Sequence, residues 1–276
     1  MNSGPTQSLT KARAYKVAGW IVLIGGILLA ISSGLVLLTV VPCYVGYLLL
    51  RRAKKYSVGT GDAALKSDVR PPVLYLRSFK DEEVESSPLF RFKNIGASER
   101  WLAQTTPGNA IQEQDGLGYL FRKIGPYIAL GRPGEELPEL GLHKIYVVND
   151  AWQDTVLDFF AKSRLVLFKA GRTEGLKWEL AELVRTVDPQ KVALILPVSD
   201  GDYASFIQWA NAILPQKLPP AYPPSRMVTF DAAWKPSYLS QRRTLTESFA
   251  PLFEANKIVV TESYWERVME QNGLRW

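Results

Sequence analysis

An uncharged stretch of 34 residues, Val17–Leu50, constrains this chain more than any other feature of its sequence. As a single helix it would be about 51 Å long, whereas the hydrocarbon core of a bilayer is about 30 Å thick. The small and polar residues Ser32–Gly34 lie near its middle, where they favour a turn. The stretch therefore predicts a hairpin of two short membrane spans, Val17–Ile31 and Leu35–Leu50.

Basic residues flank the uncharged stretch on both sides: Lys11, Arg13 and Lys16 precede it, and Arg51, Arg52, Lys54 and Lys55 follow it. Positively charged flanks stay on the cytoplasmic side, so both ends of the hairpin and the main domain are expected in the cytoplasm, at the cell (inner) membrane. A single tilted anchor stays open as an alternative, because each half is short for a full span. A signal peptide fits poorly, because the stretch is too long and lacks a small-residue cleavage site.

The net charge of +6 comes entirely from the N-terminal part of the chain. Of the 33 basic and 27 acidic residues, 8 and 2 precede Arg70, which leaves 25 of each in the rest. A balanced main domain argues against a surface that follows a nucleic-acid backbone. One cysteine, Cys43, and one histidine, His143, exclude a disulfide framework and a Cys/His metal cluster.

The chain after the uncharged stretch divides into a basic juxtamembrane linker, residues 51–70, and a main domain, residues 71–276, with a C-terminal extension; residues 1–16 form a cytoplasmic tail. Short apolar runs in the main domain predict buried parallel strands. These runs are Val73–Leu76, Tyr127–Leu130, Ile145–Val148, Leu165–Phe168, Val192–Leu196 and Met227–Phe230. Segments with helical spacing alternate with them, so we expect an α/β fold with right-handed crossovers.

Four of these helical segments are defined by apolar residues three or four positions apart: Leu117–Ile124, Trp152–Phe160, Leu176–Val187 and Tyr238–Asn256. Residues 81–115 are polar and irregular, which predicts a long surface excursion.

Polar side chains follow two of the predicted strands, at the carboxyl ends where open parallel sheets bind ligands. Lys169 and Arg172 could hold an anion there. Each such charge could equally be an ordinary solvated side chain at a strand end. The candidate ligand-binding residues at these two ends are Arg77, Ser78, Phe79, Lys80, Lys169 and Arg172.

Several familiar catalytic motifs are missing, among them GxxxxGK[ST], GxGxxG, GxSxG and HExxH. His143 follows Gly141 and is expected in a surface loop. Asp200 and Asp202 follow an apolar run and could hold the divalent metal of a membrane-bound glycosyltransferase, although an ordinary acidic turn explains them as well. We assign no metal ligand from the sequence.

The order of these elements resembles a Toll/interleukin receptor (TIR) domain, in a membrane-anchored bacterial variant. The stretch VLYLRSFKDE is similar to the strand and turn that begin such domains, and AKSRLVLFKAG is similar to a later helix end and strand. GLKWELAEL matches the helix with Trp and Glu-Leu that follows. The resemblance covers about residues 70–200. It implies a flavodoxin-like parallel sheet and contacts through the loop Gly131–Gly141.

Many TIR domains cleave NAD between nicotinamide and ribose with a glutamate on that helix. The distance from the Trp selects Glu182 here, whereas the distance from the preceding strand selects Glu179. At 100° per residue, Glu179 lies about 75° from the centre of the apolar stripe and Glu182 about 135° from it. We therefore favour Glu179, because a carboxylate at the edge of the buried face can be partly desolvated.

The resemblance thus implies an NAD glycohydrolase with NAD as substrate and no further cofactor. Arg77, Lys80, Lys169 or Arg172 would hold the pyrophosphate, and Phe79 or Trp152 would stack on a ring. The alternative is a non-catalytic assembly module that the membrane hairpin concentrates for signalling. In either case a homo-oligomer formed through the TIR-like domain is expected.

Overall fold

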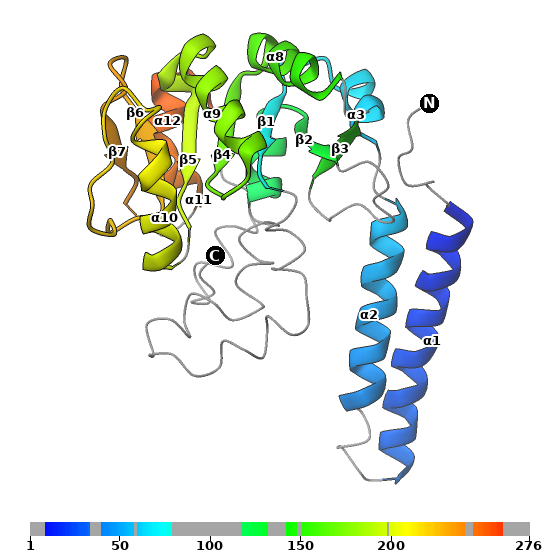
Figure 1. Cartoon of the computed structure of the whole chain (residues 1–276). Helices are drawn as coiled ribbons and strands as arrows, with labels where there is room; N and C mark the ends of the chain where they lie inside the picture. The colour runs from blue at the N-terminus through cyan, green and yellow to red at the C-terminus, as the bar shows by residue number, and fades with distance from the viewer. Residues whose placement is uncertain are drawn as a thin grey trace.

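The computed structural model describes residues 9–33, 40–57, 60–78, 117–131, 142–147, 151–197, 199–240 and 245–261. Two long helices, α1 (Leu9–Ser33) and α2 (Val40–Ser57), run antiparallel beside an α/β domain (Figure 1). Among the described helices, α1 alone is long and apolar enough to cross a membrane. The apolar part of α2, Val41–Leu50, is shorter.

Small residues let the backbones of α1 and α2 come close together. A Cβ atom added at Gly26 would lie 2.3 Å from Cβ of Pro42, and one at Gly46 would lie 2.5 Å from Cγ of Leu23. The same holds at Gly19, whose added Cβ would lie 3.2 Å from the carbonyl oxygen of Gly46. Contacts of this kind are typical of paired membrane helices, which associate by close packing.

The predicted linker, residues 51–70, holds the end of α2 and a further helix, α3 (Gly61–Ser67). The hydroxyl of Thr60 caps α3 by accepting a hydrogen bond of 3.3 Å from the Ala63 amide. Gly61 packs against strand β3 (His143–Tyr146), since a Cβ added at this glycine would lie 2.3 Å from Cγ1 of Ile145. The segment between α2 and the sheet is therefore docked on the sheet edge.

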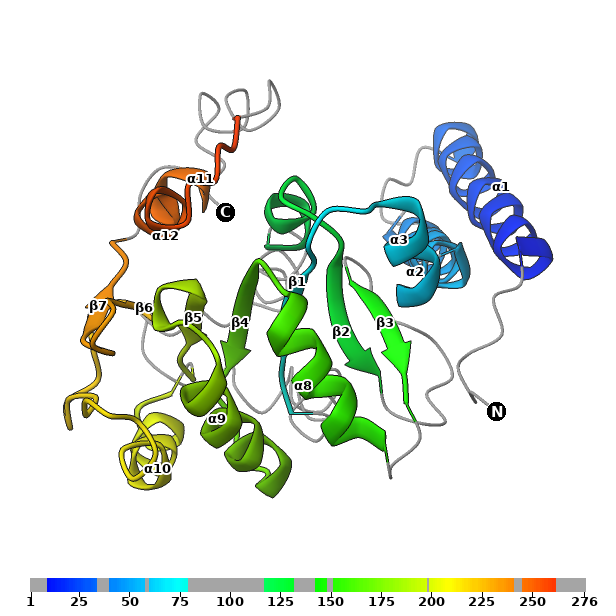
Figure 2. The same cartoon turned by 90° about the horizontal axis from the view of Figure 1, so that it is seen from above.

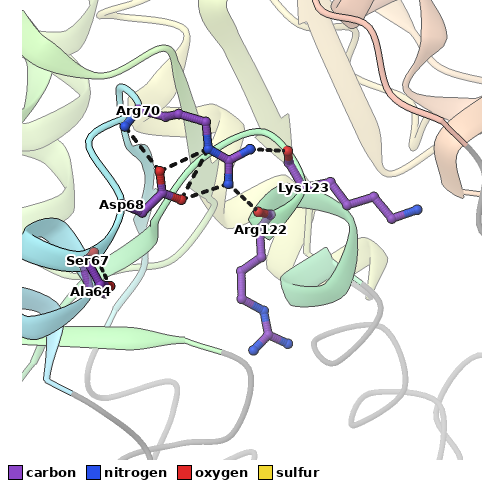
Figure 3. A network of polar contacts seen from close by, with 6 residues as sticks. All are labelled: Ala64, Ser67, Asp68, Arg70, Arg122 and Lys123. Carbon is purple, nitrogen blue, oxygen red and sulfur yellow. Dashed lines mark hydrogen bonds and ion pairs between the residues drawn. The ribbon is translucent and has the colours of Figure 1, made fainter.

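Arg70 ties the end of this segment to the main domain (Figure 3). Its guanidinium donates to Asp68, with Nη2 2.7 Å from Oδ2. It also donates from Nη1 to the carbonyl of Lys123 at 2.6 Å and from Nη2 to that of Arg122 at 3.2 Å. These carbonyls lie at the C-terminal end of the helical residues 117–122, where carbonyl groups lack intrahelical partners.

The domain is built on a 7-stranded sheet with the order β3-β2-β1-β4-β5-β6-β7. Strands β3, β2, β1, β4 and β5 are parallel to one another, whereas β6 and β7 are antiparallel additions. The expected parallel sheet is therefore mostly parallel but mixed. The bounds are β1 Val73–Leu76, β2 Tyr127–Gly131, β3 His143–Tyr146, β4 Leu165–Lys169, β5 Val192–Ile195, β6 Met227–Phe230 and β7 Pro236–Tyr238.

Two predictions for single elements are wrong. Strand β3 begins at His143, so this histidine lies in the sheet and not in a loop, and the strand stops at Tyr146. The predicted helix Tyr238–Asn256 is replaced by the end of β7 and two short helices, α11 (Leu245–Ser248) and α12 (Ala250–Ala255). Pro251 explains the break between the two helices, because proline is tolerated only in the first turn of a helix.

Helices cover both faces of the sheet, as Figure 2 shows from above. One face packs against α8 (Trp152–Lys162), α9 (Glu174–Thr186) and α10 (Asp200–Ala210). The other packs against the helical residues 117–122 and α12. Along β1 and β4 successive side chains alternate between the two cores, as the pleat of a strand requires. The short 3-10 helix Pro189–Lys191 leads from α9 into β5.

Candidate functional site

The connections that leave β1 and β4 run in opposite directions along the sheet. These strands are neighbours, with Leu76 beside Phe168, but β1 leads to β2 on one side and β4 leads to β5 on the other. In open α/β sheets the carboxyl ends at such a point are where ligands bind. The position fits the sequence-based expectation, which placed candidate residues after Leu76 and after Phe168.

Helix α9 starts from this edge of the sheet. Thr173 caps it by accepting a hydrogen bond of 3.4 Å from the Leu176 amide, and Glu174 in the first turn pairs with Lys177 at 2.7 Å. Leu176, Leu180 and Leu183 then enter the core because they repeat at intervals of three and four residues. This spacing also determines how the acidic residues of the helix are placed.

Glu179 is turned into the protein. Its exposed fraction is 9 %, and Oε2 is buried without a hydrogen-bond partner among the residues that the structure describes. Desolvation raises the pKa of this carboxyl group to about 8. A buried polar atom without a partner costs free energy, so its presence requires an explanation. At pH 7 most Glu179 side chains are therefore neutral acids that can donate a hydrogen bond.

Glu182, the other candidate acid, has an ordinary surface role. Its Oε2 accepts a hydrogen bond of 3.0 Å from Nε of Arg185, and the two side chains form an ion pair one turn apart on α9. Such a pair, three residues apart on a helix surface, occupies the carboxylate with a neighbouring side chain. Of the two acids that the sequence left as candidates, Glu179 is the one with an unused, desolvated group.

An aromatic pair flanks Glu179. Trp152, at the start of α8, meets Trp178 of α9 edge to face, with ring centroids 4.8 Å apart and an interplanar angle of 72°. A Cβ added at Gly175 would lie 3.9 Å from Cη2 of Trp152. On α9, Gly175 and Glu179 are one turn apart, so both lie on the flank toward α8. The predicted ring-stacking residue Trp152 therefore lies on the same flank as Glu179.

Arg77 and Ser78 continue β1 toward opposite faces of the sheet. The Arg77 guanidinium lies 5.7 Å from the centroid of the Tyr75 ring, in the core that α12 covers. Ser78, which is 5 % exposed, continues the alternation of Leu74 and Leu76 toward the face of α9. Of the two, Ser78 therefore shares a face with Glu179, and Arg77 does not.

The remaining candidates are placed as follows. Lys169 is the last, half-buried residue of β4, on the face of Leu165 and Leu167. Arg172 forms an ion pair with Asp202 of α10. Phe79 and Lys80 lie outside the described residues, as does the loop Arg132–Gly141.

The structure offers little for a metal ion. Within the described ranges, no three His, Cys, Asp or Glu side chains are grouped so that they could hold one. Asp200 and Asp202 lie in the first turn of α10, where Ser199 caps the helix by accepting a hydrogen bond of 3.1 Å from the Asp202 amide. Acids at a helix start are favoured by the helix dipole alone.

Sequence reasoning missed two contacts here. Trp178, which precedes Glu179, contacts Trp152, and Asp202 proves to be the partner of Arg172. The first had a partial signal, since Gly175, which has no side chain, leaves room for a large side chain on that flank of α9. The second had none, because a contact between the starts of two helices depends on how the chain folds.

The fold and site define a three-layered α/β protein with a buried acid on α9, the helix that follows β4, preceded by an apolar helix of membrane-spanning length. Comparison with known protein families, curated proteins and solved structures finds no match for this chain.

Proposed function

We propose that this chain is a membrane-anchored, TIR-like protein that cleaves NAD between nicotinamide and ribose, with Glu179 as the residue that faces the reacting ribose. The observation that carries the proposal is the buried carboxyl group of Glu179, with its unpartnered Oε2 and raised pKa, in the second turn of α9, the helix that follows β4. Perturbed acids at such positions are typical of active sites.

The strand order supports a flavodoxin-like frame for this site. If β3 is treated as an added edge strand, the remaining order β2-β1-β4-β5-β6 is the 2-1-3-4-5 order of that fold. The departure is β6, which is antiparallel to β5. The proposed site lies on the parallel part of the sheet, between β1 and β4.

Cleavage breaks the bond between the ribose carbon and the nicotinamide nitrogen. The electron pair of the bond goes to the nitrogen, nicotinamide leaves as a neutral ring, and water adds to the ribose carbon with loss of a proton. The cationic ring of bound NAD would lower the pKa of Glu179 and favour its ionised form. The resulting carboxylate would stabilise the positive charge that develops on the ribose.

Membrane attachment rests on the apolar surface of α1 and α2. Large apolar side chains stay exposed along both helices, including Trp20, Ile24, Leu28, Tyr44 and Leu48. An exposed apolar surface of this length suits lipid and not water. With basic residues on both flanks, we propose two crossings that leave the main domain in the cytoplasm.

The decisive experiment measures nicotinamide release by the full chain in detergent micelles and in vesicles at high surface density. We expect the wild-type chain to release nicotinamide from NAD and Glu179→Gln to reduce the rate at least about 100-fold. The matched control is Glu182→Gln, which removes an acid from the same helix and should keep nearly the full rate.

Two results would contradict the proposal. One is an unchanged rate in Glu179→Gln. The other is no release in either setting; self-association of the full chain would then favour the assembly module. For the membrane topology, a reporter that fluoresces only in the cytoplasm is fused to either end. Two crossings predict fluorescence from both fusions, whereas a single anchor predicts fluorescence from one.

A further inference from the structure

The ion pair between Arg172 and Asp202 joins two helix starts at the carboxyl edge of the sheet. Arg172 lies in the connection from β4 to α9, and Asp202 lies in the first turn of α10. The pair therefore lies beside the edge to which the proposed function assigns the dinucleotide.

The contact with Asp202 determines on which side of β4 the Arg172 guanidinium lies. Strand β4 lies between β1 and β5, and α10 follows β5. Because Asp202 belongs to α10, it holds the Arg172 guanidinium on the β5 side of β4. The point where the connections part lies on the other side, between β4 and β1. Arg172 is thus on the right loop to meet a diphosphate but is engaged away from it.

We propose that Asp202 is an internal competitor for the anion site of Arg172, so that a diphosphate must displace this carboxylate before Arg172 can bind it. The inference rests on the proposed function, since it describes how the same site is kept closed. It also explains why a cationic side chain at a ligand-binding edge pairs with an acid from the neighbouring connection.

A phosphate group can replace Asp202 as the partner of Arg172. The two side chains are 61 % and 44 % exposed, and exposed ion pairs contribute little to stability. A guanidinium binds phosphate with the same two-pronged geometry that it uses for a carboxylate. Asp202 keeps a second favourable interaction without Arg172, because it stays at the positive end of α10. Releasing Arg172 therefore costs little free energy.

The test measures ligand affinity of the full chain in micelles by calorimetry, in a Glu179→Gln background that prevents cleavage. Probes are inorganic pyrophosphate, NAD and nicotinamide riboside, which has no phosphate. Asp202→Asn should raise the affinity for pyrophosphate and for NAD about two- to five-fold, the range expected for one exposed ion pair. Nicotinamide riboside should bind unchanged. Arg172→Gln should weaken the binding of pyrophosphate and NAD, and in this variant Asp202→Asn should no longer raise the affinity for either ligand.

The control is Glu174→Gln, which makes the same charge change at the same edge but releases Lys177 instead of Arg172. The inference is overturned if Glu174→Gln raises the affinity for pyrophosphate and NAD as much as Asp202→Asn does. It is also overturned if Asp202→Asn still raises these affinities in an Arg172→Gln chain, or if the Asp202→Asn chain does not bind pyrophosphate. If the chain with Glu179 intact cleaves NAD but Asp202→Asn does not change ligand affinity, only this inference is overturned and the glycohydrolase proposal stands. Tighter pyrophosphate binding without any cleavage would overturn only the glycohydrolase proposal.

Discussion

Trp152 and Trp178 meet edge to face, with 4.8 Å between their ring centroids, and this contact joins the start of α8 to the flank of α9 that carries Glu179. The pair brings together residues that are distant in the sequence and places a large aromatic surface beside a buried acid.

Glu179 should make the stability of the chain depend on pH. Its pKa is raised in the folded state to about 8 from an ordinary value of 4.5, so the folded chain binds the proton more tightly than the unfolded one. The contribution of Glu179 to the free energy of unfolding is therefore fully present below pH 4.5 and is lost as the pH rises through 8. Between pH 5.5 and 8.5 the fall should be about 3 kcal/mol.

Denaturant unfolding at these two pH values checks this prediction. Glu179→Gln cannot ionise and should lose most of the pH dependence, which makes it more stable than wild type at pH 8.5. Glu182→Gln should follow the wild-type curve. Parallel curves for wild type and Glu179→Gln would show that the carboxyl group is hydrated in solution.

Trp152 should support both packing and ligand binding. Trp152→Ala removes the edge-to-face contact with Trp178 and should lower the free energy of unfolding by about 3 kcal/mol. In a Glu179→Gln background it should also weaken NAD binding about tenfold, because a stacking surface is lost. Trp152→Phe should retain most of the binding.

Calorimetry and unfolding, measured on the same samples, separate these two effects. Trp209→Ala, on α10 beside Phe206, is the control for the loss of a tryptophan elsewhere on this face of the sheet. If both variants weaken NAD equally, Trp152 has a structural role only.

Gly26 should be essential to the pairing of α1 and α2, whereas its neighbour Gly25 should not. A side chain at Gly26 would collide with Pro42, but a Cβ at Gly25 has no described atom within 4 Å. We expect Gly26→Leu to separate the helices and to speed hydrogen exchange along α2 in micelles. Gly25→Leu, which adds the same side chain to the same helix, should leave exchange unchanged. Equal exchange in both variants would mean that the pair opens in a membrane-like environment.

Arg70 should hold the segment between α2 and β1 to the main domain. Arg70→Ala removes the contacts with Asp68 and with the carbonyls of Arg122 and Lys123, and should cost about 1 kcal/mol because the side chain is half exposed. Arg70→Lys should not restore the loss, since an ammonium cannot reproduce the fork of a guanidinium. Thermal unfolding checks both, with Lys66→Ala on α3 as the control.

The sequence by itself determined the local structure of most of the domain. Apolar runs predicted β1 and β6 with their observed bounds, and helical spacing predicted α8 and α9. It also predicted that Glu179 lies closer to the buried face than Glu182. These features depend on the period of side chains along a helix or strand, which a linear sequence displays.

Only the tertiary structure decided which of these elements meet. It made β6 and β7 antiparallel, placed β3 at the outer edge, and sent Arg77 and Ser78 to opposite faces of the sheet. It paired Arg172 with Asp202 and Trp152 with Trp178. No sequence period carries such contacts, because they depend on how distant segments pack to bury their shared apolar surface.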